Sequence, residues 1–244
     1  MAAGVLTDVT LLVNGMDMSP FSGEFTCDEM AAMRPANNFA GRGYEIVLPG
    51  LFSAEATIKG HADYASGAVS STFNSASKGL RAGVSILPAG SLSVEGTQCS
   101  FMSSRLAAYK MLTGPVGDVA DFDMAFVSDA AEVEGWVSAP LASRTTSGLT
   151  TTGQLITGGV PDGKRMYAAL HVTAAAGTNL AVKIQSDDNS GFTTPTDRIT
   201  FSTVSATGWQ FGSVAGPLTG ETYWRTIVTI ASSTFTFATV LGVA

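Results

Sequence analysis

Charged side chains are scarce in this chain. Only 14% of its 244 residues are Asp, Glu, Lys or Arg, and 45% are hydrophobic. A surface with so few charges does little to keep copies of the protein apart. We therefore expect much of the surface to be covered by partners, although a β-sandwich with a surface rich in Ser and Thr would have the same composition.

Cysteine and histidine are nearly absent. Cys27 and Cys99 are the only cysteines, and because their spacing matches no metal site we expect both to be buried free thiols. His61 and His171 each lie in a strand-like stretch without a second His or Cys at ligand spacing. This pattern favours surface or hydrogen-bonded core histidines over metal ligands. We expect no metal, no cofactor and no catalytic residue, so the protein is not expected to be an enzyme.

Long apolar runs and targeting signals are also missing. No segment approaches the length that spans a membrane, and the opening MAAGVLTDVT lacks a basic stretch followed by an apolar run. We expect neither a membrane span nor a signal peptide, and hence synthesis in the cytoplasm. The glycine patterns at 41–43 and 114–115 lack the helix and lysine of a phosphate-binding loop.

The net charge of −7 is confined to the first half. Residues 1–132 contain 14 Asp and Glu against 7 Lys and Arg, whereas residues 133–244 contain 6 of each kind. An acidic excess argues against a surface that grips phosphate in the first half.

Short alternating runs favour strands over helices. From Ser53 to Tyr64 small or apolar residues alternate with polar ones without a break, as in a strand with one buried and one wet face. Pro49-Gly50 is expected to be a turn between this strand and Tyr44–Leu48, and Asn14-Gly15 indicates a hairpin. The stretch 113–127 predicts another strand, with Phe122, Met124 and Phe126 on one face.

One short helix is expected over Ser66–Gly79. Val69, Phe73 and Ala76 fall at i, i+4 and i+7, which forms one apolar stripe. We predict that Val69 and Phe73 dock this helix against the sheets of its own domain. The segment Gln98–Leu112 is compatible with either a strand or a turn of helix.

The second half predicts a β-sandwich. About seven short strands separated by turns containing Gly, Asp or Pro fit this architecture. The polar segment Ser128–Glu134 is the preferred boundary. The fold class is therefore all-β: an N-terminal two-sheet β-barrel or sandwich with one short helix in residues 1–132, and a C-terminal β-sandwich in residues 133–244.

Three groups of residues have a second, chemical interpretation. Two of these groups are acidic, and for them an ordinary hairpin turn or a solvated strand face is the favoured interpretation. The third group is aromatic, and the favoured interpretation is a place in the core of the sandwich. A calcium loop would use Asp187, Asp188, Asn189 and Asp197; a carboxylate cluster would use Asp118, Asp121 and Asp123; a sugar-binding platform would use Trp136, Trp209, Tyr223 and Trp224.

Several stretches resemble a known family. The segments VLTDVTLLVNGMDM (5–18), GYEIVLPGLFSAEATIKGHAD (43–63) and GPVGDVADFDMAF (114–126) are similar to the tail tube, or major tail, proteins of long-tailed bacteriophages. In that family the first domain is two packed antiparallel sheets with one helix, and Ser66–Gly79 stands at the position of the helix. The second half looks like a β-sandwich often fused to phage virion proteins.

The resemblance implies a structural virion protein without catalytic residues. Its first domain would form hexameric rings that stack into a tube, contact other tail proteins and conduct DNA, after assembly in the host cytoplasm. A channel wall that must not hold DNA should be neutral or acidic, so we expect one of two strand faces to line it. One face carries Glu55 and Asp63, and the other carries Asp121 and Asp123. The alternatives are a glycan- or cell-surface-binding module and a capsid decoration protein.

Overall fold

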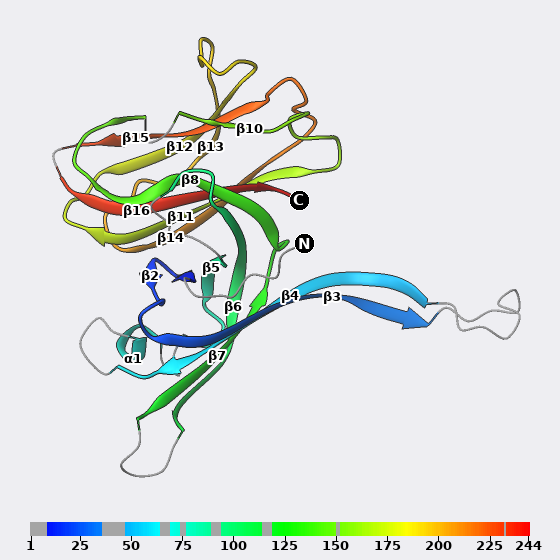
Figure 1. Cartoon of the computed structure of the whole chain (residues 1–244), viewed down its shortest axis with the longest axis vertical. Coiled ribbons are helices and arrows are strands. Elements are labelled where there is room, and N and C mark those ends of the chain that lie inside the picture. The colour runs from blue at the N-terminus through cyan, green and yellow to red at the C-terminus, as the bar shows by residue number, and fades with distance from the viewer. Residues whose placement is uncertain are drawn as a thin grey trace, which may run out of the picture. The chain divides into compact units, whose positions relative to one another are not determined.

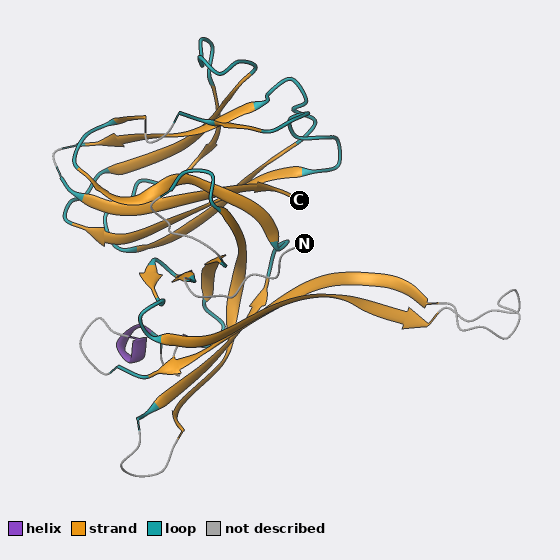
Figure 2. Cartoon of the chain, viewed as in Figure 1, coloured by secondary structure: helices purple, strands orange, loops and turns teal. Residues whose placement is uncertain are grey.

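Almost all regular structure in this protein is β-strand. The computed structural model describes residues 9–35, 47–63, 69–73, 77–88, 94–113, 119–149, 152–231 and 233–244 (Figure 1). Within these ranges the one α-helix, α1, spans only Val69–Thr72, and strands dominate everywhere else, as Figure 2 shows. The all-β class expected from the alternating sequence is confirmed. None of the described helices is long and apolar enough to cross a membrane.

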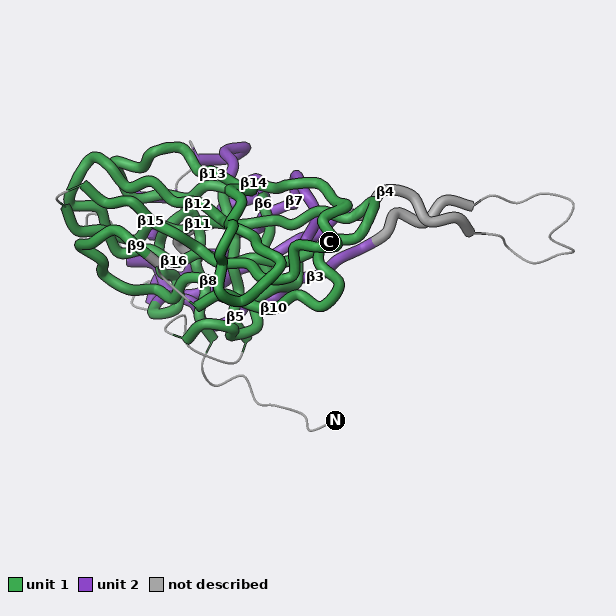
Figure 3. Tube along the Cα trace, turned by 90° about the horizontal axis from the view of Figure 1, so that it is seen from above, with its two compact units in different colours: residues 1–20, 82–103, 133–244 green, residues 21–81, 104–132 purple. Residues whose placement is uncertain are grey.

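The chain forms two compact units, coloured separately in Figure 3. Unit 1 comprises residues 1–20, 82–103 and 133–244, and unit 2 comprises residues 21–81 and 104–132. The chain passes from unit 2 to unit 1 after Glu132, within the polar segment Ser128–Glu134. Residues 1–20 and 82–103, however, cluster with the C-terminal part and not with the rest of the predicted first domain.

Unit 1 contains the β-sandwich predicted for the second half. One sheet has the order β14-β11-β16-β8, and the facing sheet has the order β10-β15-β12-β13, with β9 also paired to β15. Their bounds are β8 Val133–Arg144, β9 Gly148–Leu149, β10 Gln154–Leu155, β11 Arg165–Ala175, β12 Leu180–Asp187, β13 Thr196–Thr200, β14 Gly208–Ala215, β15 Tyr223–Ile230 and β16 Phe235–Val243.

The first sheet of the sandwich is buried on both faces. Its inner face and the second sheet enclose a core around Trp224, Phe235 and Phe237, all fully buried. Its outer face is covered by strands from the start of the chain and from residues 82–103, in a second cluster that includes Leu12, Phe101 and Val240. These strands are β1 (Thr10–Val13), β2 (Met16–Asp17), β5 (Arg81–Leu87) and the first part of β6 (Gln98–Thr113). Asn14 and Gly15 form the β1–β2 hairpin with positive φ angles of 52° and 78°, as an Asn-Gly turn requires.

A buried histidine lies on this covered outer face. The Nε2 atom of His171 in β11 lies 2.8 Å from the Oγ atom of Ser85 in β5, and both side chains are fully buried. Burial lowers the pKa of His171 to about 4, because the charged ring would lose its hydration. His171 is therefore neutral at pH 7.

Unit 2 is built on one four-stranded antiparallel sheet. Its order is β3 (Ser22–Pro35), β4 (Val47–His61), β7 (Asp121–Ser128) and the part of β6 from Ser104 onward. One face is apolar and buried, with Ile58, Met124 and Leu106 from three of the strands. Helix α1 and the residue after it belong to this face: Val69 is fully buried, and the ring of Phe73 meets that of Phe126 edge-on, with centroids 6.3 Å apart.

The hairpin β3–β4 continues past the end of β7. Strand β4 pairs with β7 only from Glu55 to His61, whereas the β3–β4 pairing runs on to Pro35 opposite Val47. In Figure 1 this part is the two-stranded ribbon labelled β3 and β4. It contradicts the predicted turn at Pro49-Gly50. Proline is tolerated here because β4 has no described partner on its other side and the pairing shifts register between Ala31 and Met33.

Two other local expectations need correction or completion. The described helix covers four residues, whereas the sequence predicted Ser66–Gly79; Ser66 and Ala76 lie outside the described residues. Gln98–Leu112, which was compatible with either helix or strand, is the strand β6. Its apolar and polar residues alternate around a register shift between Leu106 and Ala108, and this extra residue obscures the period of two.

Candidate assembly surface

The two predicted channel-lining faces are one and the same face. Strands β4 and β7 are neighbours, and their register places Lys59 opposite Asp123 and His61 opposite Asp121. Residues directly opposite in an antiparallel pair point to the same side of the sheet. We call this side the polar face. It contains Glu55, Asp121 and Asp123, which alternate with the buried residues of the apolar face.

The outer strands β3 and β6 extend the polar face. Glu24 of β3 stands opposite Lys59, and its carboxylate accepts a hydrogen bond of 2.9 Å from the Lys59 Nζ atom. This bond raises the pKa of Lys59. On the other side of β7, Lys110 of β6 stands opposite Asp123. Asp28 of β3 stands opposite Glu55, and Arg105 of β6 stands opposite Val127, so both also belong to the polar face.

A shallow hollow of about 420 Å³ lies on the polar face. The charged and ionisable residues that line it are Glu24, Lys59, His61, Lys110, Asp121 and Asp123. The His61 Nδ1 atom lies 2.9 Å from the Asp121 Oδ1 atom, and both side chains remain exposed. The charges of the surface are thus mixed, with carboxylates in the majority.

The remaining predicted residues have separate positions. Asp63 is half-buried and follows the end of β4, beyond the residues that pair with β7. Val69 and Phe73 lie on the opposite, apolar side of the same unit. Asp118 lies outside the described residues, so only Asp121 and Asp123 of the proposed carboxylate cluster are placed, on one strand face.

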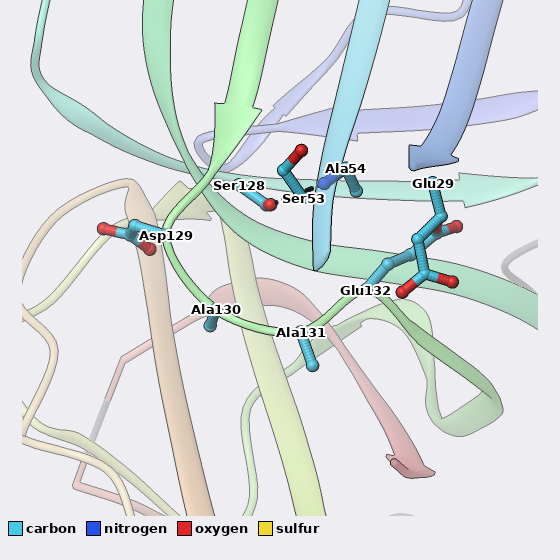
Figure 4. A pocket seen from close by; sticks show the side chains of 8 residues that line it. All are labelled: Glu29, Ser53, Ala54, Ser128, Asp129, Ala130, Ala131 and Glu132. Atoms are coloured by element: carbon cyan, nitrogen blue, oxygen red, sulfur yellow. Dashed lines mark hydrogen bonds between the residues drawn. The ribbon is translucent and has the colours of Figure 1, made fainter. Parts of the chain in front are cut away.

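A second hollow, of about 400 Å³, lies beside the loop that follows β7 (Figure 4). The Oγ atom of Ser128 accepts a hydrogen bond of 2.8 Å from the backbone N–H of Ala54, where the β4–β7 ladder ends. Asp129 binds Arg81 at 2.8 Å. Glu29 and Glu132 also line this hollow.

The thiol of Cys27 contacts Glu132, one of the residues that line this second hollow, and is not reactive. Its Sγ atom donates to a Glu132 oxygen 3.4 Å away. Burial, and then the negative charge of Glu132, raise the pKa of Cys27 to about 12, so the thiolate is not formed near neutral pH. Among the described residues no group of three or more His, Cys, Asp and Glu side chains is placed to hold a metal ion.

The carboxylates of the possible calcium loop are engaged by the chain itself. Asp187 accepts hydrogen bonds from the backbone N–H groups of Asn189 and Thr194, at 3.2 and 2.9 Å. Asp197 accepts from Lys183, at 2.6 Å. These bonds hold a turn between β12 and β13, which is the ordinary hairpin interpretation.

The aromatic residues do not form an exposed platform. Trp224 is fully buried in the sandwich core and donates from its ring nitrogen to the Glu221 carbonyl, at 2.8 Å. Trp136 is half-buried against the same core. Trp209 lies over Gly83, where any side chain would collide with the indole ring. A sugar-binding surface needs exposed rings, which these three tryptophans do not supply.

Glu24 and Lys110 are the surface residues that sequence reasoning missed. Glu24 lies in the run FSGEFTCDEM, in which Phe25 and Cys27 alternate with Glu24 and Asp28. That alternation could have identified a polar strand face. Lys110 gave no comparable signal, because the register shift in β6 interrupts its alternation.

Comparisons with known proteins find likeness at the level of solved structures. No family model and no curated protein matches the chain. One match is a chain from the virion of a native gene transfer agent particle, with 13% identity over 50% of this chain and 92% of that chain and a TM-score of 0.36. A chain from the tail of an empty gene transfer agent particle has 16% identity over the same shares and a TM-score of 0.31. The SPP1 Dit protein, described as a hub of the adsorption apparatus in phages that infect Gram-positive bacteria, has 9% identity over 98% and 100% and a TM-score of 0.35.

Proposed function

We propose that this protein is a structural subunit of a bacteriophage-type tail. Its unit 2 forms rings, taken as hexamers from the sequence resemblance, and the rings stack into a tube that conducts DNA. The observation that carries the proposal is the sheet of unit 2, which buries one face within its own unit and leaves a charged face and an edge strand for neighbours.

The edges of this sheet support assembly. Among the described strands β3 pairs only with β4, so no described strand bonds to the N–H and C=O groups along one long edge of the sheet. Such an edge attracts another strand, and closure of sheets from several copies into one barrel removes it. A ring subunit therefore gains stability from its neighbours that it lacks alone.

The charges of the polar face support a wall that DNA can pass. Carboxylates outnumber cations there, and Lys59 is neutralised by Glu24 at 2.9 Å. A wall of this kind releases few counterions from passing phosphates and so does not trap the duplex. DNA is on this proposal a passing cargo and not a ligand, and other tail proteins are the lasting partners.

The matched structures come from tails and virions, but they superpose too loosely to add weight to the proposal. The alternative of a glycan-binding module is disfavoured because Trp224 is buried and Trp136 and Trp209 are only half-exposed. No feature of the described residues favours a capsid decoration protein over a tail subunit.

The test is the assembly state of the purified protein. Negative-stain microscopy and light scattering across a concentration series should show rings or tubes. Compact monomers at every concentration, in a protein that melts cooperatively, would rule out the proposal. Phe25→Ala, on the apolar face, is a control for effects on folding alone. It should destabilise the subunit without changing the symmetry of any rings.

A further inference from the structure

A row of alternating charges crosses the polar face of unit 2 from edge to edge. The register places Glu24 opposite Lys59, Lys59 opposite Asp123, and Asp123 opposite Lys110. All four side chains line the same hollow. The row therefore runs negative, positive, negative, positive across β3, β4, β7 and β6. It begins with a carboxylate at one edge and ends with an amine at the other.

Both ends of the row lie on strands that can accept a further strand. Among the described strands β3 pairs with β4 alone. On the side of β6 away from β7, the segment before β5 is bonded to Leu106. The Leu106 N–H donates to the Leu80 carbonyl, and the Gly79 N–H donates to the Leu106 carbonyl. Past that point, the only described strand that pairs with β6 is β7.

The direction of the strands fits a head-to-tail contact between copies. Each of the four strands runs antiparallel to the next one across the sheet. The two outer strands, β3 and β6, therefore run in opposite directions. A second copy related by a rotation then presents its β3 antiparallel to β6 of the first. An odd number of strands would have made that junction parallel.

We propose that the ends of this row set the register between neighbouring subunits, with Lys110 of one copy opposite Glu24 of the next. The row then continues unbroken around the assembly, and Ala108 falls opposite Thr26. The inference rests on the proposed ring function and names the pair that aligns its subunits. A shift by one residue would turn the charged side chains to the other face, and a shift by two would leave Lys110 opposite an uncharged residue. Asp28, four residues from Glu24, is the other carboxylate on this face of β3 among the described side chains.

Charge reversal with mixing tests the pair. Glu24→Lys alone and Lys110→Glu alone each place like charges at every junction, so each should raise the concentration needed for ring formation by about tenfold or more. An equimolar mixture should assemble again, because alternating copies restore opposite charges at every junction. Each variant carries its own internal like-charge contact whether alone or mixed, so the mixture isolates the contact between copies.

Matched controls carry the same charge changes away from the sheet. Asp162→Lys and Lys164→Glu lie in an exposed turn of unit 1, and their rings should form at the wild-type concentration. Thermal melts of each variant at concentrations below assembly check that the subunit itself is folded.

A cysteine pair reports the register directly. In Thr26→Cys/Ala108→Cys the two thiols of one subunit are three strand spacings apart, about 14 Å, which is too far for a disulfide. In the proposed register they face each other between copies, so mild oxidation of rings should give a ladder of covalent oligomers. Asp28→Cys/Ala108→Cys, displaced by two residues, should give much less.

The outcomes separate this inference from the proposed function. Wild-type protein that stays monomeric would overturn both. Wild-type rings, together with single variants that assemble normally or a mixture that fails to assemble, would overturn the Lys110–Glu24 register while leaving the ring function standing. A stronger ladder from the displaced cysteine pair would do the same.

Discussion

The main sheets of the two units differ in how completely they are covered. In unit 1 the sheet β14-β11-β16-β8 has an apolar cluster on each face, so Leu170 and Val240 point to opposite sides and both are fully buried. In unit 2 the sheet has Ile58 buried on one side and Glu55 exposed on the other. A sheet with both faces buried leaves no face for a further partner, whereas a sheet with one face buried leaves the other face for solvent or for neighbouring subunits.

The edges of the two sheets show the same difference. At the edge strand β14 of unit 1, the side chain of Gln210 bonds both the N–H and the C=O of Ser202, at 2.7 and 2.8 Å. This contact holds the segment after β13 against the edge strand β14, within the same unit. The edge strand β3 of unit 2 carries Glu24 and Asp28 instead, charges that oppose unselective pairing and permit pairing with a matched charge.

The largest effect is expected when residues 133–244 are isolated from the rest of the chain. The inner core of the sandwich consists wholly of residues from Trp136 onward, so we expect this fragment to fold by itself. It loses the cover of Leu12, Leu87 and Phe101 and should therefore melt below the full chain. Circular dichroism during heating measures both effects. A fragment without a cooperative transition would show that the cover is essential to the sandwich.

Phe73→Ala should destabilise unit 2. The ring is buried and meets Phe126 edge-on, so truncation should cost about 3 kcal/mol or more of the free energy of unfolding, as aromatic core truncations do. Chemical denaturation followed by far-UV circular dichroism measures this loss of free energy of unfolding. Val127→Ala, at an exposed position of the same sheet, is the matched control and should change little. An unchanged midpoint for Phe73→Ala would place the helix outside the fold of its unit.

Acid should weaken unit 1 through His171. The pKa in the folded protein is about 4, below the ordinary 6.5, because the ring is buried. Between these values the unfolded chain binds a proton that the folded protein excludes, so stability is complete above pH 6.5 and falls toward pH 4. The loss should reach up to about 3 kcal/mol. The free energy of unfolding measured from pH 7 to pH 4 should lose this slope in His171→Gln and keep it in His61→Gln, which changes an exposed histidine.

Lysine on the polar face should have the smallest effect on folding and a distinct effect on function. Glu55→Lys/Asp121→Lys/Asp123→Lys changes exposed or half-exposed side chains, so the subunit should fold and assemble at moderate salt. If the polar face lines the channel, the added charges hold passing phosphates and slow DNA ejection from the particle, most strongly at low salt. The same number of lysines placed on the exposed turn around Asp162 is the control. An unchanged ejection rate would place the polar face away from the DNA.

Local pattern in the sequence determined the strands and their faces. The alternation from Ser53 onward and the apolar series Phe122, Met124 and Phe126 are properties of a strand with one wet side, and the structure has both. The turns of the second half likewise follow from Gly, Asp and Pro at the ends of short apolar runs. The predicted turn at Pro49-Gly50 is wrong, because proline's effect on a strand depends on whether its other edge is paired, and neighbouring residues do not reveal this.

Which strands lie side by side cannot be predicted from the local sequence. Strand neighbours come from pairings between distant segments, such as Lys59 with Asp123, and hydrogen bonds between backbones carry no trace of their partner in the local sequence. The sequence therefore predicted two acidic faces, Glu55 with Asp63 and Asp121 with Asp123, where there is one polar face that carries three of those four residues. It also could not join Glu24 and Lys110 into one row. The residues supply the charge and the period of two, and the long-range register turns them into a surface.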